Sequence, residues 1–279
     1  RLPGFIHNHV PCGIAHYTPD KDAEEALRAI ARGVQLPRGF SQQQITGIYL
    51  MGSLGSLAQA RSSDLDVWLC YDEALSGQEI IDLQSKCDRI ERWAEDMNVE
   101  LHFFLMNLSD FRRGASHEAD GEDCGSTQHV LLLDEFYRSA LWLAGRQPRW
   151  WLIPCEQERR ADQWWQTLQE HHRVNADHWI DFGAVPSIPA AEFVGAGLWQ
   201  LNKGLSDPYK SLLKLLITRH YAGQFPNIRP LCWDLKQQVH KGTTDAGSND
   251  AYLLMLARIT RQLQQDGNHE RVELARRAF

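Results

Sequence analysis

The sequence predicts an α+β fold in which a small α/β domain is followed by a mostly helical domain. Three apolar, strand-like runs lie within the first 106 residues. Between the second and third runs, apolar residues recur every three or four positions, which is the period of an amphipathic helix. From Glu156 onward the pattern is almost wholly helical. We therefore place the small domain at residues 1–125 and the helical domain at residues 126–279, with a ligand cleft between them.

Each element follows from a local signal. Asp20 or Asp22 is suited to cap a first helix, and Ser76 a second, because short polar side chains accept hydrogen bonds from a helix's first turn. Apolar runs bounded by turn residues predict the strands. The expected elements are a helix over 23–32, strands over 47–51 and 65–70, a helix from 77 to 97, a strand over 99–106 and a helix over 127–143.

Composition indicates a folded protein of the reducing cytoplasm. Hydrophobic residues make up 43% of the 279 residues, and ten tryptophans argue against disorder. No run approaches the roughly 20 apolar residues that a membrane span needs. Six scattered cysteines are unlike a disulfide framework. Because the chain opens with Arg1 and shows no signal peptide, we expect it to be a fragment of a longer protein.

The charge balance bears on the kind of partner. The chain carries 29 basic and 36 acidic residues, a net charge of −7. A protein that neutralises several phosphates of a polynucleotide usually has a basic face, and this chain has no dense run of Lys and Arg. The sequence therefore disfavours a nucleic-acid partner and favours a small nucleotide as ligand.

Paired carboxylates are the most informative feature. Asp64 and Asp66 open the second strand-like run, and residues two apart in a strand point to the same side. Two like charges on one buried face are costly unless a cation compensates them. Mg²⁺ suits this pattern because it binds one or two protein carboxylates together with substrate phosphates. In the third run Glu100 and His102 share a face, so Glu100 joins the pair if the strands are neighbours.

The order of features resembles a known superfamily. Gly52 and Ser53 form a small turn, ten residues follow, and then come the Asp-x-Asp pair, a helix and a strand with a glutamate. This order resembles the nucleotidyltransferase superfamily, which includes DNA polymerase β, poly(A) polymerases and aminoglycoside nucleotidyltransferases. The resemblance implies a small mixed sheet of the polymerase β-like type. It also implies two Mg²⁺ ions held by carboxylates, with Mn²⁺ able to replace them, and a Gly-Ser turn that grips a triphosphate.

Three further segments narrow the resemblance to one family. Residues 121–129 read Gly-Glu-Asp-Cys-Gly-Ser-Thr-Gln-His, residues 192–203 run from a glutamate through Leu-Trp-Gln-Leu to a lysine, and residues 206–214 read Ser-Asp-Pro-Tyr-Lys-Ser-Leu-Leu-Lys. They are similar to the catalytic region of the class I, enterobacterial-type adenylate cyclases. The sequence departs from the family pattern at Val194 and Asn202, where the family usually has aromatic residues.

The resemblance implies a lyase that converts ATP to 3′,5′-cyclic AMP and pyrophosphate. Asp64, Asp66 and Glu100 would be both the metal ligands and the catalytic residues, and Glu100 would also accept the proton of the ribose 3′-hydroxyl. The family's C-terminal regulatory region, which responds to the glucose phosphotransferase system, is absent from this sequence. The residues expected to bind the nucleotide are Gly52, Ser53, Ser63, Ser126, Lys203, Lys210 and Lys214.

Several alternatives stay open at this stage. A transferase of the same superfamily, passing a nucleotidyl group to a sugar, a drug or an RNA end, would share every carboxylate. A non-enzymatic nucleotide-sensing module is a second alternative, although the intact motif residues argue against it. Ser126 is either a phosphate ligand or only a helix cap. Trp68 either borders the nucleotide or belongs to the core.

Overall fold

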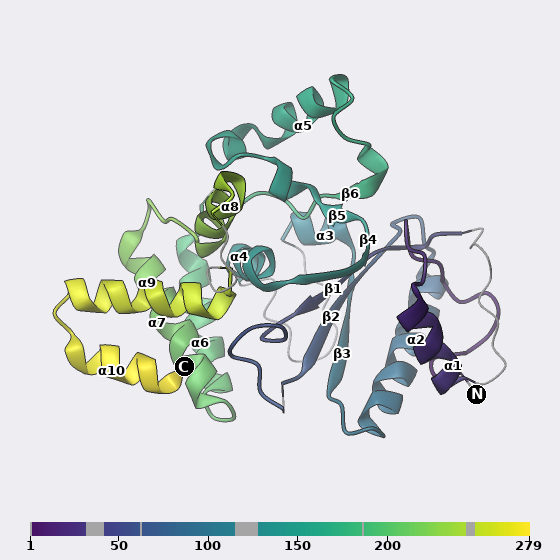
Figure 1. Ribbon diagram of the computed structural model, residues 1–279, viewed down its shortest axis with the longest axis horizontal. Coiled ribbons are helices and arrows are strands. Elements are labelled where there is room, and N and C mark those ends of the chain that lie inside the picture. Colours follow the sequence, from purple (N-terminus) through teal and green to yellow (C-terminus); the bar gives the residue numbers. More distant parts are fainter. Residues whose placement is uncertain (1, 32–41, 62, 115–127, 186, 244–248) are drawn as a thin grey trace.

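A four-stranded mixed sheet lies at the centre of the computed structural model (Figure 1). The structure describes residues 2–31, 42–61, 63–114, 128–185, 187–243 and 249–279. The sheet order is β3-β2-β1-β4, in which β1 is antiparallel to both β2 and β4, and β2 is parallel to β3. The α+β fold with a small mixed sheet is confirmed. The strands are β1 Ile45–Met51, β2 Leu65–Tyr71, β3 Leu101–Met106 and β4 Leu141–Gly145.

The fourth strand corrects one prediction. The expected helix over 127–143 ends at Ser139, because α4 spans His129–Ser139 and Ala140 is extended, with ψ 132°. The following apolar residues then pair with the free edge of β1, with Leu141 opposite Leu50. A short apolar run suits a helix and a buried strand equally, and the unpaired edge of β1 decides between them. The domain boundary at residue 125 stays a prediction, although β4 adds to the sheet from beyond it.

One face of the sheet is covered by α2, Gly77–Glu95. The predicted cap is present as a full capping box, in which Ser76 accepts from the Glu79 N–H and the Glu79 side chain accepts from the Ser76 N–H. The helix α1, Lys21–Ile30, is capped by Asp20. Between α2 and the sheet lies a small core of Ile45, Leu69, Tyr71, Leu83 and Cys87.

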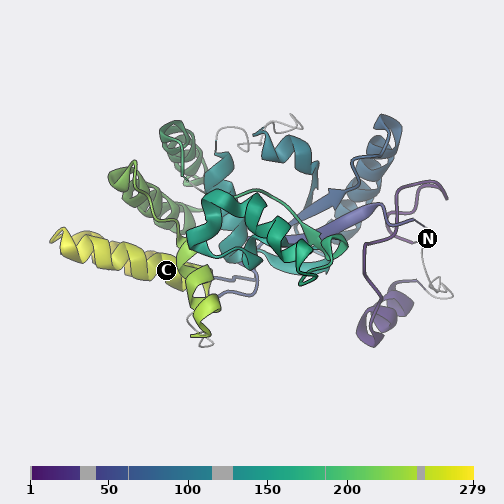
Figure 2. The ribbon, with the colours of Figure 1, turned by 90° about the horizontal axis from the view of Figure 1, so that it is seen from above.

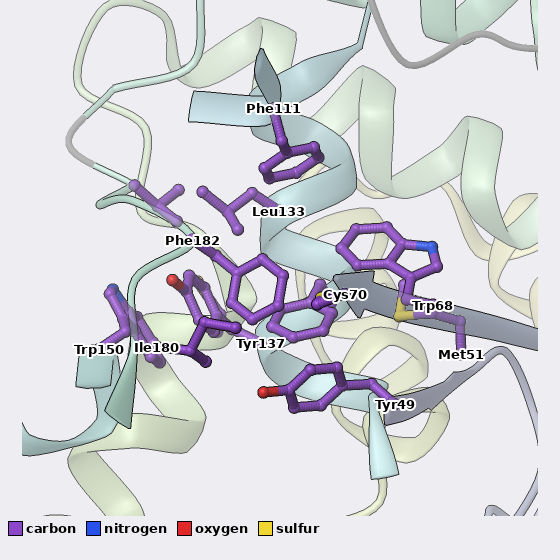
Figure 3. Close-up of a cluster of buried hydrophobic side chains, with 13 residues drawn as sticks. Tyr49, Met51, Trp68, Cys70, Phe111, Leu133, Tyr137, Trp150, Ile180 and Phe182 are labelled. Atoms are coloured by element: carbon purple, nitrogen blue, oxygen red, sulfur yellow. The ribbon is translucent and has the colours of Figure 1, made fainter. Parts of the chain in front are cut away.

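The opposite face of the sheet carries an aromatic core (Figure 3). Trp68 is 5% exposed and stacks on Phe136, with ring centroids 4.8 Å apart. Tyr49 and Phe182 meet edge to face at 5.3 Å. Trp68 is therefore a core residue, since its ring is enclosed by other aromatic rings and not left free to meet a nucleotide. The connecting elements around this core are α3 Leu108–Arg112, β5 Gln147–Pro148, η2 Arg149–Leu152, η3 Cys155–Arg160, α5 Ala161–Glu170, η4 Ala176–His178 and β6 Trp179–Ile180.

The C-terminal helices gather at one end of the molecule, and the N-terminal segment with α2 lies at the other (Figure 2). The C-terminal helices share a second core, the helical core, which includes Leu213, Ile217, Met255 and Ile259. Ala58, from the segment between β1 and β2, also packs against it. Among the described residues no helix is both long and apolar enough to cross a membrane. The five helices are α6 Ala190–Lys203, α7 Pro208–Gln224, α8 Leu231–Lys241, α9 Ala251–Gln265 and α10 His269–Ala278.

Candidate functional site

Asp66 is the second residue of β2, and Asp64 immediately precedes the strand. Asp66 sits between Met51 of β1 and His102 of β3 in the register of the sheet, so it is flanked by strands on both sides. Partial burial, and next the charge of Asp64, raise the pKa of Asp66 to about 6. The two carboxylates are therefore close enough for their charges to repel, and that they share one face stays a prediction.

Three positive groups act on Asp66 from other elements. His102, Lys214 and Lys203 each lower its pKa, but together they do not overcome burial and the repulsion from Asp64. The site is therefore short of positive charge. Two carboxylates in this state suit a divalent cation, because Mg²⁺ uses one or two protein carboxylates and completes its shell with phosphates and water.

The predicted turn follows β1 directly. Gly52 has φ +100°, a backbone conformation strained for any L side chain, and a Cβ placed there would meet nothing within 4 Å. Its backbone is thus open to an approaching ligand. Ser53 is 3% exposed, and its Oγ is 3.0 Å from the Oγ of Ser63. The Oγ of Ser63 also accepts from the Ala60 N–H at 2.9 Å, so the two serines hold the loop together.

Glu100 stands just before β3, next to the start of β2. Its carbonyl accepts the Leu65 N–H at 2.9 Å, while its carboxylate, 65% exposed, lies 3.3 Å from His102 Nε2. In the part of the chain that the structure describes, no group of three or more His, Cys, Asp or Glu side chains is placed to hold a metal ion. Asp64 and Asp66 are therefore assembled without Glu100, whose side chain faces His102.

The predicted lysines have different surroundings. Lys203 ends α6 with its Nζ 5.6 Å from the ring centroid of Trp199. Lys214 on α7 pairs with Glu135 of α4 at 2.9 Å, whereas Lys210 pairs with Asp207 at the start of its own helix at 3.6 Å. Lys203 and Lys214 are the two whose charges act on Asp66.

No role was predicted from the sequence for two acidic residues that hold other parts of the chain, Glu135 and Glu192. Glu135 holds Lys214, and Glu192 of α6 accepts from the N–H groups of Val130 and Leu131 at 2.9 Å, which caps a helix whose own N-cap residue forms no side-chain bond. Burial raises the pKa of Glu192. The usable signal was a carboxylate within an apolar helical run, because such a group must find a partner. Ser126, the remaining predicted nucleotide ligand, lies outside the described residues.

The residues around Asp66 define a candidate site for a divalent cation and a phosphate-bearing ligand. Models of known families match most of the chain. Residues 1–151 match the adenylate cyclase NT domain, and residues 188–279 match the second domain of class-I adenylate cyclase. The chain belongs to the class-I adenylate cyclase family.

Curated relatives carry the same name. The adenylate cyclases of Salmonella typhimurium and Escherichia coli K12 are each 42% identical over 285 residues, and that of Yersinia pestis is 41% identical over 282 residues. Each alignment covers 100% of this chain and 33% of the relative, so the chain spans about a third of these proteins' length.

Solved structures add little. A toxin–antitoxin crystal structure with AMP-PNP covers 47% of this chain and 83% of its own, at 17% identity and a TM-score of 0.24. A TM-score this low bears neither on the fold nor on the site.

Proposed function

We propose that this chain is the catalytic region of an adenylate cyclase, a lyase that converts ATP to 3′,5′-cyclic AMP and pyrophosphate. The observation that carries the proposal is the charge pattern at Asp66. Asp64, just before β2, repels Asp66, and the charges of Lys203 and Lys214 act on Asp66 from two helices. Carboxylates that bind a cation and lysines that meet phosphates are the two needs of a metal–triphosphate ligand. Membership of the class-I family supports the choice of ATP.

We propose Asp64 and Asp66 as ligands of two Mg²⁺ ions, with Mn²⁺ able to replace them. The charge repulsion between them and the raised pKa of Asp66 support this assignment. Glu100 is proposed as the third ligand because it heads the strand beside Asp64, although its carboxylate would have to turn away from His102. When bound, the ions neutralise phosphate charge and lower the pKa of the ribose 3′-hydroxyl.

The protein's own share of the reaction is then positioning. Gly52 offers open backbone to the triphosphate, and the bonded pair of Ser53 and Ser63 keeps the turn in place. Lys203 and Lys214 stabilise charge on the departing pyrophosphate. Holding the 3′-hydroxyl in line with the α-phosphorus replaces a collision between separate molecules by an internal attack.

Three further assignments complete the proposal. Lys210 is one helical turn from Lys214 and is proposed as an outer phosphate contact. Ser126, outside the described residues, is proposed as a nucleotide ligand on the family resemblance alone. We also propose a cytoplasmic protein without a nucleic-acid partner, whose longer form is regulated through the glucose phosphotransferase system.

The test is to incubate the purified chain with α-labelled ATP and Mg²⁺ and to resolve the products. Asp64→Asn and Asp66→Asn should each abolish turnover, because each removes a proposed metal ligand. Asp72→Asn, just past the other end of β2, is the matched control and should retain activity. Labelled cyclic AMP made by the wild type and the control only would support the proposal.

Two other outcomes would overturn it. Label transferred to an added acceptor instead of cyclic AMP would make the protein a nucleotidyltransferase. Full activity in Asp66→Asn would remove the metal assignment, even if cyclic AMP were the product.

A further inference from the structure

An ion pair between α4 and α7 holds Lys214, one of the two lysines whose charges act on Asp66. Lys214 Nζ lies 2.9 Å from Glu135 Oε1, with the two side chains only 27% and 18% exposed. Burial works against both charges, yet the pKa of Glu135 is lowered, chiefly by the Lys214 ammonium, and the pKa of Lys214 is raised by Glu135. Both groups are therefore charged at neutral pH, and each depends on the other.

The helix that carries Glu135 is anchored independently of Lys214. The N-terminus of α4 is held by the carboxylate of Glu192 from α6. One residue before Glu135, the buried Asp134 accepts from the Tyr221 hydroxyl of α7 at 3.0 Å and from the Cys232 N–H of α8 at 2.9 Å. The backbone at Glu135 is thus held in place by other contacts, and its carboxylate restrains the long side chain of Lys214.

The helix α7 is linked to the segment that follows the Gly-Ser turn, and the charge of Lys214 acts on Asp66. Leu213, the neighbour of Lys214, belongs to the helical core, and Ala58, from the segment that follows the Gly-Ser turn, packs against that core. The same segment is tied to the start of α9, because Asp250 Oδ2 accepts the Leu57 N–H at 2.7 Å. The segment after the turn is therefore connected to α7 through the helical core, and α7 is connected to α4 through Lys214 and Glu135.

We propose that Glu135 is a positioning residue, which holds the Lys214 ammonium in place for the phosphates of a nucleotide bound at Asp64 and Asp66. The inference rests on the proposed function, and it adds a residue that touches neither substrate nor metal. A free lysine has four rotatable side-chain bonds, so fixing it before the ligand arrives lowers the entropy lost on binding. The carboxylate also keeps the partly buried amine protonated.

The experiment is a double-mutant cycle with Glu135→Gln, Lys214→Met and the two combined. The probes are Mg²⁺-pyrophosphate, whose binding is measured by calorimetry, and ATP turnover, from which kcat and KM are separated. We expect Glu135→Gln to weaken pyrophosphate binding about tenfold and to lower kcat/KM about 10- to 100-fold. The combined variant should be no worse than Lys214→Met alone, because both changes remove the same contact.

Two controls keep a folding defect apart from a positioning defect. Glu273→Gln removes an exposed pair with Arg276 on α10 and should leave every parameter unchanged. Glu135→Asp retains the charge on a shorter side chain and should recover part of the lost affinity, which a purely structural role would not require. Thermal midpoints are recorded for all variants, and the kinetics are measured well below the lowest midpoint.

The outcomes separate this inference from the proposed function. Suppose the wild type makes cyclic AMP and Glu135→Gln retains full pyrophosphate affinity and full kcat/KM. That result would overturn the positioning role alone. Losses that add in the combined variant would also overturn it, since Glu135 would then act independently of Lys214. If the wild type made no cyclic AMP but Glu135→Gln still weakened pyrophosphate binding tenfold, the positioning role would stand and the proposed function would fail.

Discussion

Replacing Glu158 by glutamine should be among the most destabilising single changes in the aromatic core. Glu158 and Lys236 form a pair, 3.1 Å apart, whose side chains are 1% and 0% exposed. The Lys236 ammonium also lies 3.6 Å from the ring centroid of Trp150. The carboxylate further accepts from the Trp150 indole N–H and from the Val185 N–H. One carboxylate thus satisfies three donors from three segments of the chain.

The magnitude follows from what glutamine leaves behind. It keeps one acceptor oxygen, removes the negative charge and turns an NH₂ group toward existing donors. Breaking a buried ion pair on one side costs about 3–5 kcal/mol, because an uncompensated charge remains. Against a total stability of about 5–15 kcal/mol, such a loss would be plain in a urea titration followed by tryptophan fluorescence. The exposed Glu273→Gln control should change the free energy of unfolding by less than about 0.5 kcal/mol.

The sign of the pH dependence provides a second check. Burial already lowers the pKa of Lys236, and removing the carboxylate lowers it further. Between the lowered folded pKa and the ordinary value of about 10.5, the unfolded chain binds more protons than the folded one, so stability rises with pH. The deficit of Glu158→Gln should therefore be largest near pH 7 and shrink toward pH 9.5. A deficit under 1 kcal/mol at pH 7, or one that grows with pH, would refute the reasoning.

Two smaller changes test the caps that place the elements. Ser76→Ala removes the hydroxyl that accepts from the Glu79 N–H in the capping box of α2, and should lower the free energy of unfolding by about 1 kcal/mol in urea titration. An unchanged urea midpoint would contradict it. Asp250→Ala removes the α9 cap together with the bond to Leu57, and should cost about 1–2 kcal/mol. It should also speed hydrogen exchange at the Leu57 amide, so unchanged protection there would show that the contact does not hold the loop.

Local sequence signals predicted most of the sheet and α2. The strands were found because their apolar residues alternate or run together between turn residues, and α2 because a cap precedes a clear helical period. The prediction for residues 141–145 was wrong because the local signal there is ambiguous. Their apolar run has no period of its own, and its state is decided by the unpaired edge of β1, which lies almost a hundred residues earlier in the chain. Pairing at that distance leaves no local mark.

Some features of the candidate site can likewise be predicted from local sequence, and others cannot. The prediction that Asp64 and Asp66 share a face needs strand geometry alone, and the register places Asp66 between β1 and β3. Other contacts depend on how separate elements pack. Examples are the hydrogen bond between Ser53 and Ser63 and the ion pair of Lys214 with Glu135. The sequence shows only that a carboxylate in an apolar helix needs a partner, without indicating which one.

The arrangement of charge around Asp66 explains why this particular set of residues belongs together. A folded protein normally avoids placing two carboxylates close together in a partly buried place, and here burial, with the repulsion from Asp64 added, raises the pKa of Asp66 to about 6. The lysines relieve it only in part, and Lys214 is already engaged by Glu135. A cation between the aspartates would remove the repulsion, and phosphates beyond it would give the lysines their own partners. A cation would thus match the repelling carboxylates and phosphates would match the lysines, which is why we expect the site to bind metal and nucleotide together.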